Sequence, residues 1–221
     1  MNAQDQELVA LFQALDTPGV SDAMDKLGIP GQCLGIAPLD NYRGTVVGPA
    51  FTVQYVSCGR PAGTVGNFID DVAPGEVVVI NNGGRTDCTV WGDIMTQYAG
   101  LRGIAGTVID GVCRDVAKAL DDGYPLFTLG RYMRTGKDRV EVAAVNGPVS
   151  IGRARVMARD IVVADANGVV VVPRGCARDV AETAHRIEAA ESRIRELISL
   201  GMTLGEARAQ LGYHRLQTRD T

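Results

Sequence analysis

The sequence has no long hydrophobic run and no cluster of basic residues. Its apolar stretches have the length of a strand, well short of the roughly 20 residues that span a bilayer. The net charge is −4 and the basic residues are scattered, so the chain lacks the footprint of a nucleic-acid-binding surface. Residues 1–5 lack the basic and then apolar layout of a signal peptide. We therefore expect a cytoplasmic protein that binds neither a membrane nor a nucleic acid.

Paired cysteines, aromatic residues and histidines are also scarce. The five cysteines are widely spaced and include no C-x-x-C pair, which argues against a disulfide framework and a structural zinc site. Aromatic residues make up only 5% of the chain, so Val, Ile, Leu and Ala must build the core. The two histidines, His185 and His214, have no metal-ligand spacing, and each is more typical of a helix surface or an interface than of a general base.

Glycine, in contrast, is abundant. The 27 glycines indicate many tight turns and close backbone approaches. The chain of 221 residues contains no internal repeat, low-complexity tract or linker, so we predict a single domain over residues 1–221.

Hydrophobic periodicity predicts an alternation of helices and strands. Helices are predicted at 4–15, 22–27, 64–72, 88–101, 116–120, 179–200 and, after a capping Thr203, 204–211. Strands are predicted at 45–47, 51–56, 77–80, 104–109, 125–129, 140–145, 149–155, 161–164 and 169–173. Residues 17–19 are expected to break the first helix, residues 31–40 to be irregular, and Asn146-Gly147 and Asn167-Gly168 to form hairpin turns. The alternation between residues 77 and 129 predicts an α/β fold with some parallel pairing.

Three charged residues lie where an α/β sheet usually binds its ligand. Asp93 is early in one predicted helix, and Arg114-Asp115 follow the carboxyl end of the strand 104–109. Arg114 has a planar donor set that matches a carboxylate. Asp115 and Asp93 offer the hard oxygen ligands that Mg²⁺ or Mn²⁺ prefers. A structural salt bridge or a helix cap explains the same spacing equally well.

Other reactive groups fit structural roles better. The segment Asn81-Asn82-Gly83-Gly84 lacks the Lys-Ser/Thr of a P-loop and the G-x-G-x-x-G of a Rossmann turn, so no nucleotide site is predicted. Lys118 is typical of a solvated helix lysine, and Cys113 of a packed residue at a strand end.

The site motif resembles that of a known family. Asp93, twenty intervening residues and Arg114-Asp115 match the D-x20-R-D signature of the class II pyruvate aldolases in the RraA-like family. The flanking segments 44–53, 74–79, 91–93, 106–111, 162–165 and 168–173 agree, so the resemblance extends roughly from Thr17 to Pro173. It implies a layered mixed sheet of the swivelling β/β/α type with helices at both termini. Aldolases of this family cleave 4-hydroxy-4-methyl-2-oxoglutarate or 4-carboxy-4-hydroxy-2-oxoadipate to release pyruvate, and several also decarboxylate oxaloacetate.

The resemblance also implies a role for each residue of the motif. Asp115 would bind the metal, Mg²⁺ or Mn²⁺, directly, and Asp93 would hold metal-bound water. Arg114 would bind the pyruvyl unit and stabilise the enolate. The backbone N–H groups of Ile94 and Met95, which follow Gly92 at a helix start, would hold the substrate carboxylate.

Two features depart from the family pattern. In the aldolases a glutamate from a neighbouring subunit completes the metal shell; Glu188 and Glu191 are the candidates here, and a solvated helix face explains them equally well. A histidine that lines the family's substrate pocket has no counterpart, and residues 83–87 stand in its place. Arg85 in this segment is either a reader of a second substrate carboxylate or a surface arginine.

The same fold includes regulators of ribonuclease activity, which lack the acidic residue that Asp93 supplies. The presence of Asp93 therefore favours a metal-dependent lyase that acts on an oxo acid and yields pyruvate. The alternatives are a non-catalytic binding protein of the ribonuclease-regulator type and a lyase for an unrelated small acid. Family members form trimers or hexamers, so the resemblance also implies a homo-oligomer.

Overall fold

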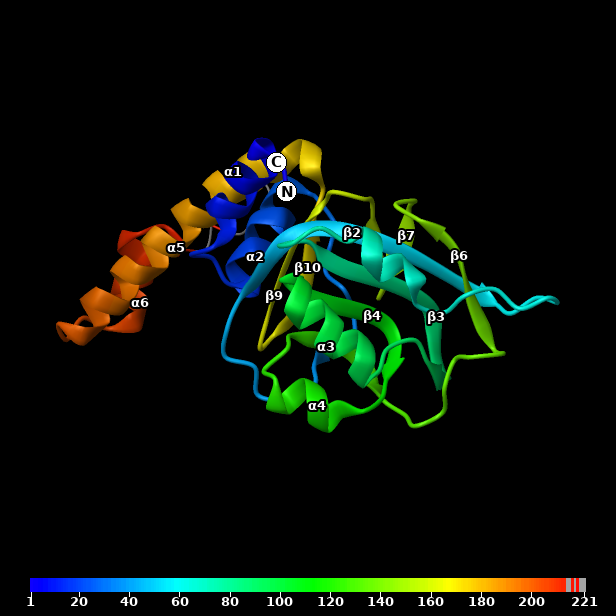
Figure 1. The fold of residues 1–221 in the computed structure, drawn as a ribbon. Coiled ribbons are helices and arrows are strands. Elements are labelled where there is room, and N and C mark those ends of the chain that lie inside the picture. Colours follow the sequence, from blue (N-terminus) through cyan, green and yellow to red (C-terminus); the bar gives the residue numbers. More distant parts are fainter. Residues whose placement is uncertain (214–215, 217, 219–221) are drawn as a thin grey trace.

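A mixed β-sheet forms the centre of the computed structural model, which describes residues 1–213, 216 and 218 (Figure 1). Its eight strands run in the order β1-β5-β4-β3-β2-β9-β10, and β6 pairs with β2. The strands of this sheet are β1 (Ala37–Pro38), β2 (Val46–Ser57), β3 (Val77–Thr89), β4 (Gly106–Cys113), β5 (Leu126–Arg131), β6 (Val140–Val145), β9 (Ile161–Asp165) and β10 (Gly168–Val172). The four strands β2 to β5 are parallel, so their carboxyl ends meet at one edge. The predicted α/β class and layered mixed sheet are confirmed.

Two cores separate the layers. On one face of the parallel strands, α3 (Asp93–Arg102) and α4 (Val116–Asp121) cover a cluster that includes Ile80 and Ile109. On the opposite face, alternate residues such as Val79 and Val108 pack against the hairpin β9–β10 and the small sheet of β7 (Val149–Ile151) and β8 (Ala154–Val156). Because successive side chains of a strand point to opposite faces, the valine-rich strands supply both cores at once.

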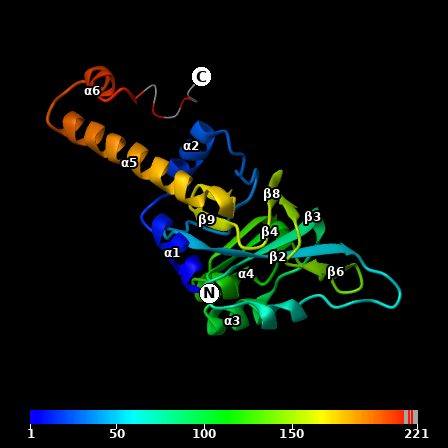
Figure 2. The same ribbon diagram turned by 90° about the horizontal axis from the view of Figure 1, so that it is seen from above.

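The terminal helices form a further layer. α1 (Ala3–Phe12), α2 (Thr17–Leu27) and α5 (Ala177–Ser199) enclose a third apolar cluster with β9 and β10. α6 (Leu204–Gln210) packs back on the distal part of α5, and its predicted Thr203 capping box is confirmed. Figures 1 and 2 show α5 and α6 projecting from the body of the molecule, away from α3 and α4. None of the described helices is long and apolar enough to cross a bilayer.

The prediction that residues 45–47 and 51–56 are separate strands was wrong. β2 is continuous through Gly48-Pro49, and the strand changes its partner there: Val46 to Pro49 pair with β9, and Ala50 to Gln54 pair with β3. A Cβ on Gly48 would lie 2.4 Å from the Gly75 carbonyl oxygen, so the glycine permits a close backbone crossing and does not end the strand.

β3 is also longer than predicted, and the helix after it starts later. The strand runs to Thr89 through Gly83 and Gly84, whose φ angles of 65° and 67° accompany shifts in the pairing with β4. These bulges carry the chain past residue 88, where a helix was predicted, and α3 begins only at Asp93. β4 likewise continues through Asp110-Gly111 to Cys113, so Arg114 follows the strand directly.

The remaining differences concern short segments. Residues 17–19 do not break a helix; they form the first turn of α2, because the Asp16 side chain accepts the Gly19 N–H at 2.9 Å. Residues 64–72 contain only the short 3₁₀ helix η1 (Asn67–Asp71), and the segment predicted to be irregular contains β1. Asn167-Gly168 does join the hairpin β9–β10, whereas Asn146-Gly147 connects β6 to β7, which lie in different sheets. A second 3₁₀ helix, η2 (Arg174–Cys176), precedes α5.

Candidate active site

The structure brings the three predicted site residues together at the carboxyl edge of the sheet. The Arg114 N–H donates to the Trp91 carbonyl oxygen at 3.1 Å, which ties the end of β4 to the segment that leads into α3. The Asp93 N–H donates to Asp115 Oδ2 at 3.3 Å. Asp93 and Asp115, which are 22 positions apart in the sequence, are therefore in direct hydrogen-bond contact, as expected for a helix start and a strand end at the same edge of the sheet.

Asp115 has an unusual backbone conformation. Its φ of 55° and ψ of 40° lie in the left-handed region, and it occupies the N-cap position of α4. Its side chain accepts no capping bond from α4; instead Oδ2 faces the Nε atom of Arg114 at 3.3 Å. Both side chains are about 40% exposed (41% and 39%), so the pair is open to a ligand. Left-handed backbone at a non-glycine residue is a strained feature that often marks functional sites.

Gly92 makes this arrangement possible. A Cβ at this position would lie 2.8 Å from Asp115 Oδ2 and 3.4 Å from Arg114 Nε. The φ of Gly92 is −145°, an extended conformation that any residue adopts. The glycine is therefore needed for the close approach of two side chains and not for its backbone freedom.

The start of α3 is held in place by a buried tryptophan. Trp91 Nε1 donates to Thr96 Oγ1 at 3.0 Å, and Thr96 Oγ1 donates to the Gly92 carbonyl at 3.1 Å. The Trp91 ring stacks on Tyr124 with a centroid distance of 6.1 Å. Of the two backbone donors predicted to hold a carboxylate, that of Ile94 binds Asp93 Oδ1 at 2.8 Å. The Met95 backbone lies beside it at the same positive end of the helix dipole.

Two pockets of about 270 Å³ each adjoin Arg114. The first pocket is formed by the loop that precedes α3, the first turn of α3 and Thr135, and its lining includes five predicted site residues: Gly92, Asp93, Ile94, Met95 and Arg114. The second pocket is lined by Arg114, Asp115 and Val116 and by the last residue of β5 with the two residues after it. Arg114 lines both pockets. It therefore lies between the first turn of α3 in the first pocket and the carboxylate of Asp115 in the second.

The carboxylates at this edge fit a hard divalent cation. Mg²⁺ is usually bound through one or two protein carboxylates and keeps several waters. Asp93 and Asp115 are the two carboxylate residues at this edge, and the Asp93 N–H donates to Asp115 Oδ2. Within the described residues there is no cluster of three or more His, Cys, Asp or Glu side chains with metal-binding geometry. Asp93 and Asp115 are thus the residues that would hold such an ion.

Arg85 lies outside both pockets. Its guanidinium is bound to Asp87 through Nε at 2.9 Å and Nη2 at 2.8 Å. The donor set of Arg85 thus already has an anionic partner, and its role as a reader of a second substrate carboxylate stays a prediction.

Glu188 and Glu191 are also remote from Asp115 in the single chain. Both lie on α5 and pair with Arg195, Glu191 at 3.5 Å. Figures 1 and 2 place α5 away from α3 and α4. His185, on the same helix, contacts the Leu11 carbonyl oxygen through Nε2 at 2.9 Å, and His214 lies outside the described residues.

Burial raises the pKa of two groups close to this edge of the sheet. Burial raises the pKa of the Cys113 thiol to about 11, so it is protonated at neutral pH and packs in the core as predicted. Burial also raises the pKa of Asp110, which lies on the opposite face of the sheet. Sequence reasoning missed Arg131 and Thr135, which line the pockets; the rule that ligands bind beyond the carboxyl ends of strands would have drawn attention to Arg131 at the end of β5.

Comparison with known protein families gives a match that contains the whole site. The family model described as RraA-like, Aldolase/RraA, matches residues 17–171. Protein DlpA of Legionella pneumophila is 40% identical over 197 residues, which are 88% of this chain but 32% of that protein, so the chain spans about a third of the length of DlpA. A protein of Halalkalibacterium halodurans named "Putative 4-hydroxy-4-methyl-2-oxoglutarate aldolase" is 33% identical over 201 residues, which cover 90% of this chain and 92% of that protein.

Solved structures agree with this match. An uncharacterized protein from Pseudomonas syringae pv. tomato has a TM-score of 0.84 and 45% sequence identity, with 92% of this chain and 97% of that chain covered. Streptomyces coelicolor RraAS2, described as an unusual member of the RNase ES inhibitor RraA family, has a TM-score of 0.78 and 29% identity, with 86% and 96% covered. The chain is thus similar both to proteins named as aldolases and to a protein named after a ribonuclease inhibitor.

Proposed function

The chain belongs to the RraA-like family, and on this premise we propose that it is a divalent-metal-dependent lyase. Its substrate would be a 4-hydroxy-2-oxo acid of the 4-hydroxy-4-methyl-2-oxoglutarate type, which it cleaves by a retro-aldol reaction to release pyruvate. The observation that carries this proposal is the convergence of Asp93, Arg114 and Asp115 at one edge of the sheet. Asp93 and Arg114 line one pocket there, and Arg114 and Asp115 line the adjoining one.

The residues of the site support each requirement of this reaction. Retro-aldol cleavage breaks the bond to the hydroxyl-bearing carbon and leaves negative charge on the 2-oxo oxygen of the pyruvyl half. A guanidinium aimed at that oxygen stabilises the charge as it develops. Among the described residues, the Arg114 guanidinium pairs with an anion only through Nε, which lies 3.3 Å from Asp115 Oδ2. A bound Mg²⁺ or Mn²⁺ would supply Lewis-acid polarisation of the same oxygen. Asp115 and Asp93 would hold that ion and its water, and the first turn of α3 would hold the carboxylate of the substrate.

Oxaloacetate decarboxylation is a related activity that we include in the proposal. Loss of carbon dioxide from oxaloacetate leaves the same charge on the same oxygen as retro-aldol cleavage does. The groups that stabilise one reaction therefore stabilise the other. As in the family pattern, we propose that the chain acts as a trimer or hexamer in which a neighbouring subunit completes the site.

A second candidate function is a non-catalytic binding protein that regulates a ribonuclease. The similarity to Streptomyces coelicolor RraAS2 favours it. Such a role needs no metal and no exposed Arg–Asp pair. Capture of a ribonuclease by the chain, without turnover of any oxo acid, would support this function over the lyase.

Two substitutions test the lyase site directly. Asp115→Asn and Arg114→Gln should each lower kcat/KM for pyruvate release by about 10²- to 10³-fold. The first weakens the proposed hold on the metal ion, and the second removes the positive charge that faces the developing oxyanion. Both side chains are about 40% exposed, so melting temperatures should stay close to that of the wild type. Asp87→Asn is the matched control, because this exposed carboxylate pairs with Arg85 outside both pockets. Wild-type rates in either site variant would refute the assignment.

A further inference from the structure

The pocket beside Asp115 contains a second arginine that the motif does not include. Six residues line this pocket of about 270 Å³: Arg114, Asp115, Val116, Arg131, Tyr132 and Met133. Two of them carry positive charge and one carries negative charge. The pocket thus has a formal charge of +1, which favours an anionic ligand.

The register of the sheet explains why Arg131 reaches this place. In the parallel pairing of β4 with β5, Arg131 lies opposite Cys113, the residue immediately before Arg114. The Tyr132 N–H donates to the Cys113 carbonyl oxygen at 2.9 Å and fixes this end of the pairing. Paired residues of neighbouring strands point to the same face. Because Cys113 belongs to the core under α3 and α4, Arg131 lies on the face of the sheet that carries the site.

The guanidinium of Arg131 has no anionic partner in the part of the chain that the structure describes. Its Nη2 atom donates a 3.4 Å hydrogen bond to the Leu39 carbonyl oxygen. The residue is exposed, at the rim of the pocket. This differs from Arg85, whose guanidinium is bound at two points by Asp87. Of the two arginines, Arg131 is the one available to a carboxylate ligand.

We propose that Arg131 binds the distal carboxylate of the substrate and so makes the enzyme selective for 2-oxo diacids over the corresponding monoacids. The inference rests on the proposed function, since it places the 2-oxo acid end of the substrate at Arg114. Arg114 lines both pockets, so a ligand anchored there can extend past Asp115 toward Arg131. The apolar side chains of Val116 and Met133 also line this pocket, where they would contact the carbon chain between the two carboxylates of the substrate. Arg131 is a specificity residue in this scheme, because it contacts a part of the substrate that does not react.

Two matched substrates test the inference. 4-Hydroxy-4-methyl-2-oxoglutarate yields two pyruvates, and 4-hydroxy-4-methyl-2-oxopentanoate, in which a methyl group replaces the distal carboxylate, yields pyruvate and acetone. Arg131→Gln should lower kcat/KM for the diacid by about 10- to 100-fold, the usual effect of a lost charge-assisted hydrogen bond, and should leave the monoacid rate within about twofold. Arg131→Lys should retain part of the preference, because it keeps the charge. Arg134→Gln, in the same segment but outside the pocket, is the control.

Binding separates this inference from the proposed reaction. 2-Oxoglutarate and 2-oxopentanoate carry no hydroxyl group to cleave, and calorimetric titration in the presence of Mg²⁺ measures their affinities directly. Tighter binding of the diacid to the wild type, lost in Arg131→Gln, would support the inference even if neither hydroxy acid is turned over and the lyase proposal fails. Equal losses for diacid and monoacid, no loss for the diacid, or no diacid preference in the wild type would overturn it.

Discussion

Gly92 determines the geometry of the site at the scale of single residues. An added Cβ would meet Asp115 Oδ2 at 2.8 Å and would push this carboxylate or the start of α3 out of place. Gly92→Ala should therefore lower kcat/KM for pyruvate release by about tenfold or more, since displacements near 1 Å are known to have effects of up to about 100-fold. The extended backbone of Gly92 is compatible with alanine, so the fold should be retained.

Gly100→Ala is the matched control for this prediction. Gly100 lies in the same helix, and a Cβ there would meet no atom within 4 Å. Alanine is favoured over glycine inside a helix by about 1 kcal/mol, so this variant should be fully active and slightly more stable. Loss of activity in both variants, or in neither, would contradict the role assigned to Gly92.

The sequence was sufficient to predict that three charged residues come together at one edge of the sheet, but not which residues surround them. Asp93, Arg114 and Asp115 were predictable because a strand end and a helix start bring them to one edge whatever the lengths of the intervening loops. Arg131 was missed because its position depends on the register between β4 and β5, which the sequence alone does not give. The pairing of Arg85 with Asp87, only two residues away, depends on the bulged conformation of β3, which the sequence does not show either.

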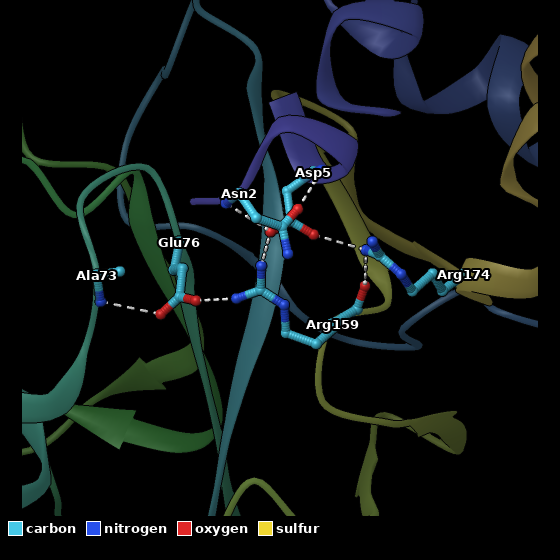
Figure 3. A network of polar contacts seen from close by, with 6 residues as sticks. All are labelled: Asn2, Asp5, Ala73, Glu76, Arg159 and Arg174. Atoms are coloured by element: carbon cyan, nitrogen blue, oxygen red, sulfur yellow. Dashed lines mark hydrogen bonds and ion pairs between the residues drawn. The ribbon is translucent and has the colours of Figure 1, made fainter. Parts of the chain in front are cut away.

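At the scale of elements, a network of charges anchors α1 to the rest of the fold (Figure 3). Asp5 is fully buried and binds the guanidinium groups of both Arg159 and Arg174, the latter at 2.8 Å. Arg159 also binds Glu76 at the start of β3, and Asn2 caps the helix at the Asp5 N–H. One carboxylate thus joins α1, the loop before β9 and the entry to α5.

This network predicts an unequal response to two substitutions in α1. Asp5→Asn leaves two partly buried arginines short of a partner and should lower the free energy of unfolding by about 3 kcal/mol. Glu7→Gln removes an exposed ion pair with Arg178, whose side chains are 53% and 56% exposed, and should change it by less than about 1 kcal/mol. Urea unfolding of both variants measures the difference. Equal effects would show that the buried network does not anchor the helix.

Element types were predicted better than element boundaries. The long apolar runs in β3, β4, β9 and β10 and the amphipathic α5 were recognised because burial on both faces or on one stripe leaves a clear pattern. The predicted end of β3 was nine residues too early (80 against Thr89), and the predicted start of α3 was five residues too early (88 against Asp93). Two glycines with positive φ continue the strand as a bulge where the sequence is typical of a turn. The prediction of a break at Gly48-Pro49 was wrong for a related reason. β2 changes its pairing partner there from β9 to β3 without ending.

At the scale of the whole molecule, the layers place the proposed site and the C-terminal helix apart. α3 and α4 carry the site on one face of the sheet, whereas α5 belongs to the layer around β9 and β10. Glu188 and Glu191 therefore do not reach Asp115 within one chain, and the family's shared metal site between subunits stays a prediction. The end of α5 and the helix α6 project from the body of the molecule, away from the central sheet, as Figure 2 shows.

The most direct test of the account is pyruvate release from 4-hydroxy-4-methyl-2-oxoglutarate, followed by coupling to lactate dehydrogenase. The wild-type chain is assayed with Mg²⁺ or Mn²⁺, after removal of the metal with EDTA, and after its return. We expect pyruvate formation that EDTA abolishes and added metal restores, because Asp93 and Asp115 offer the two carboxylates that such an ion needs. Absence of pyruvate in the presence of metal, or a rate that EDTA leaves unchanged, would contradict the assignment of this site as a metal-dependent lyase.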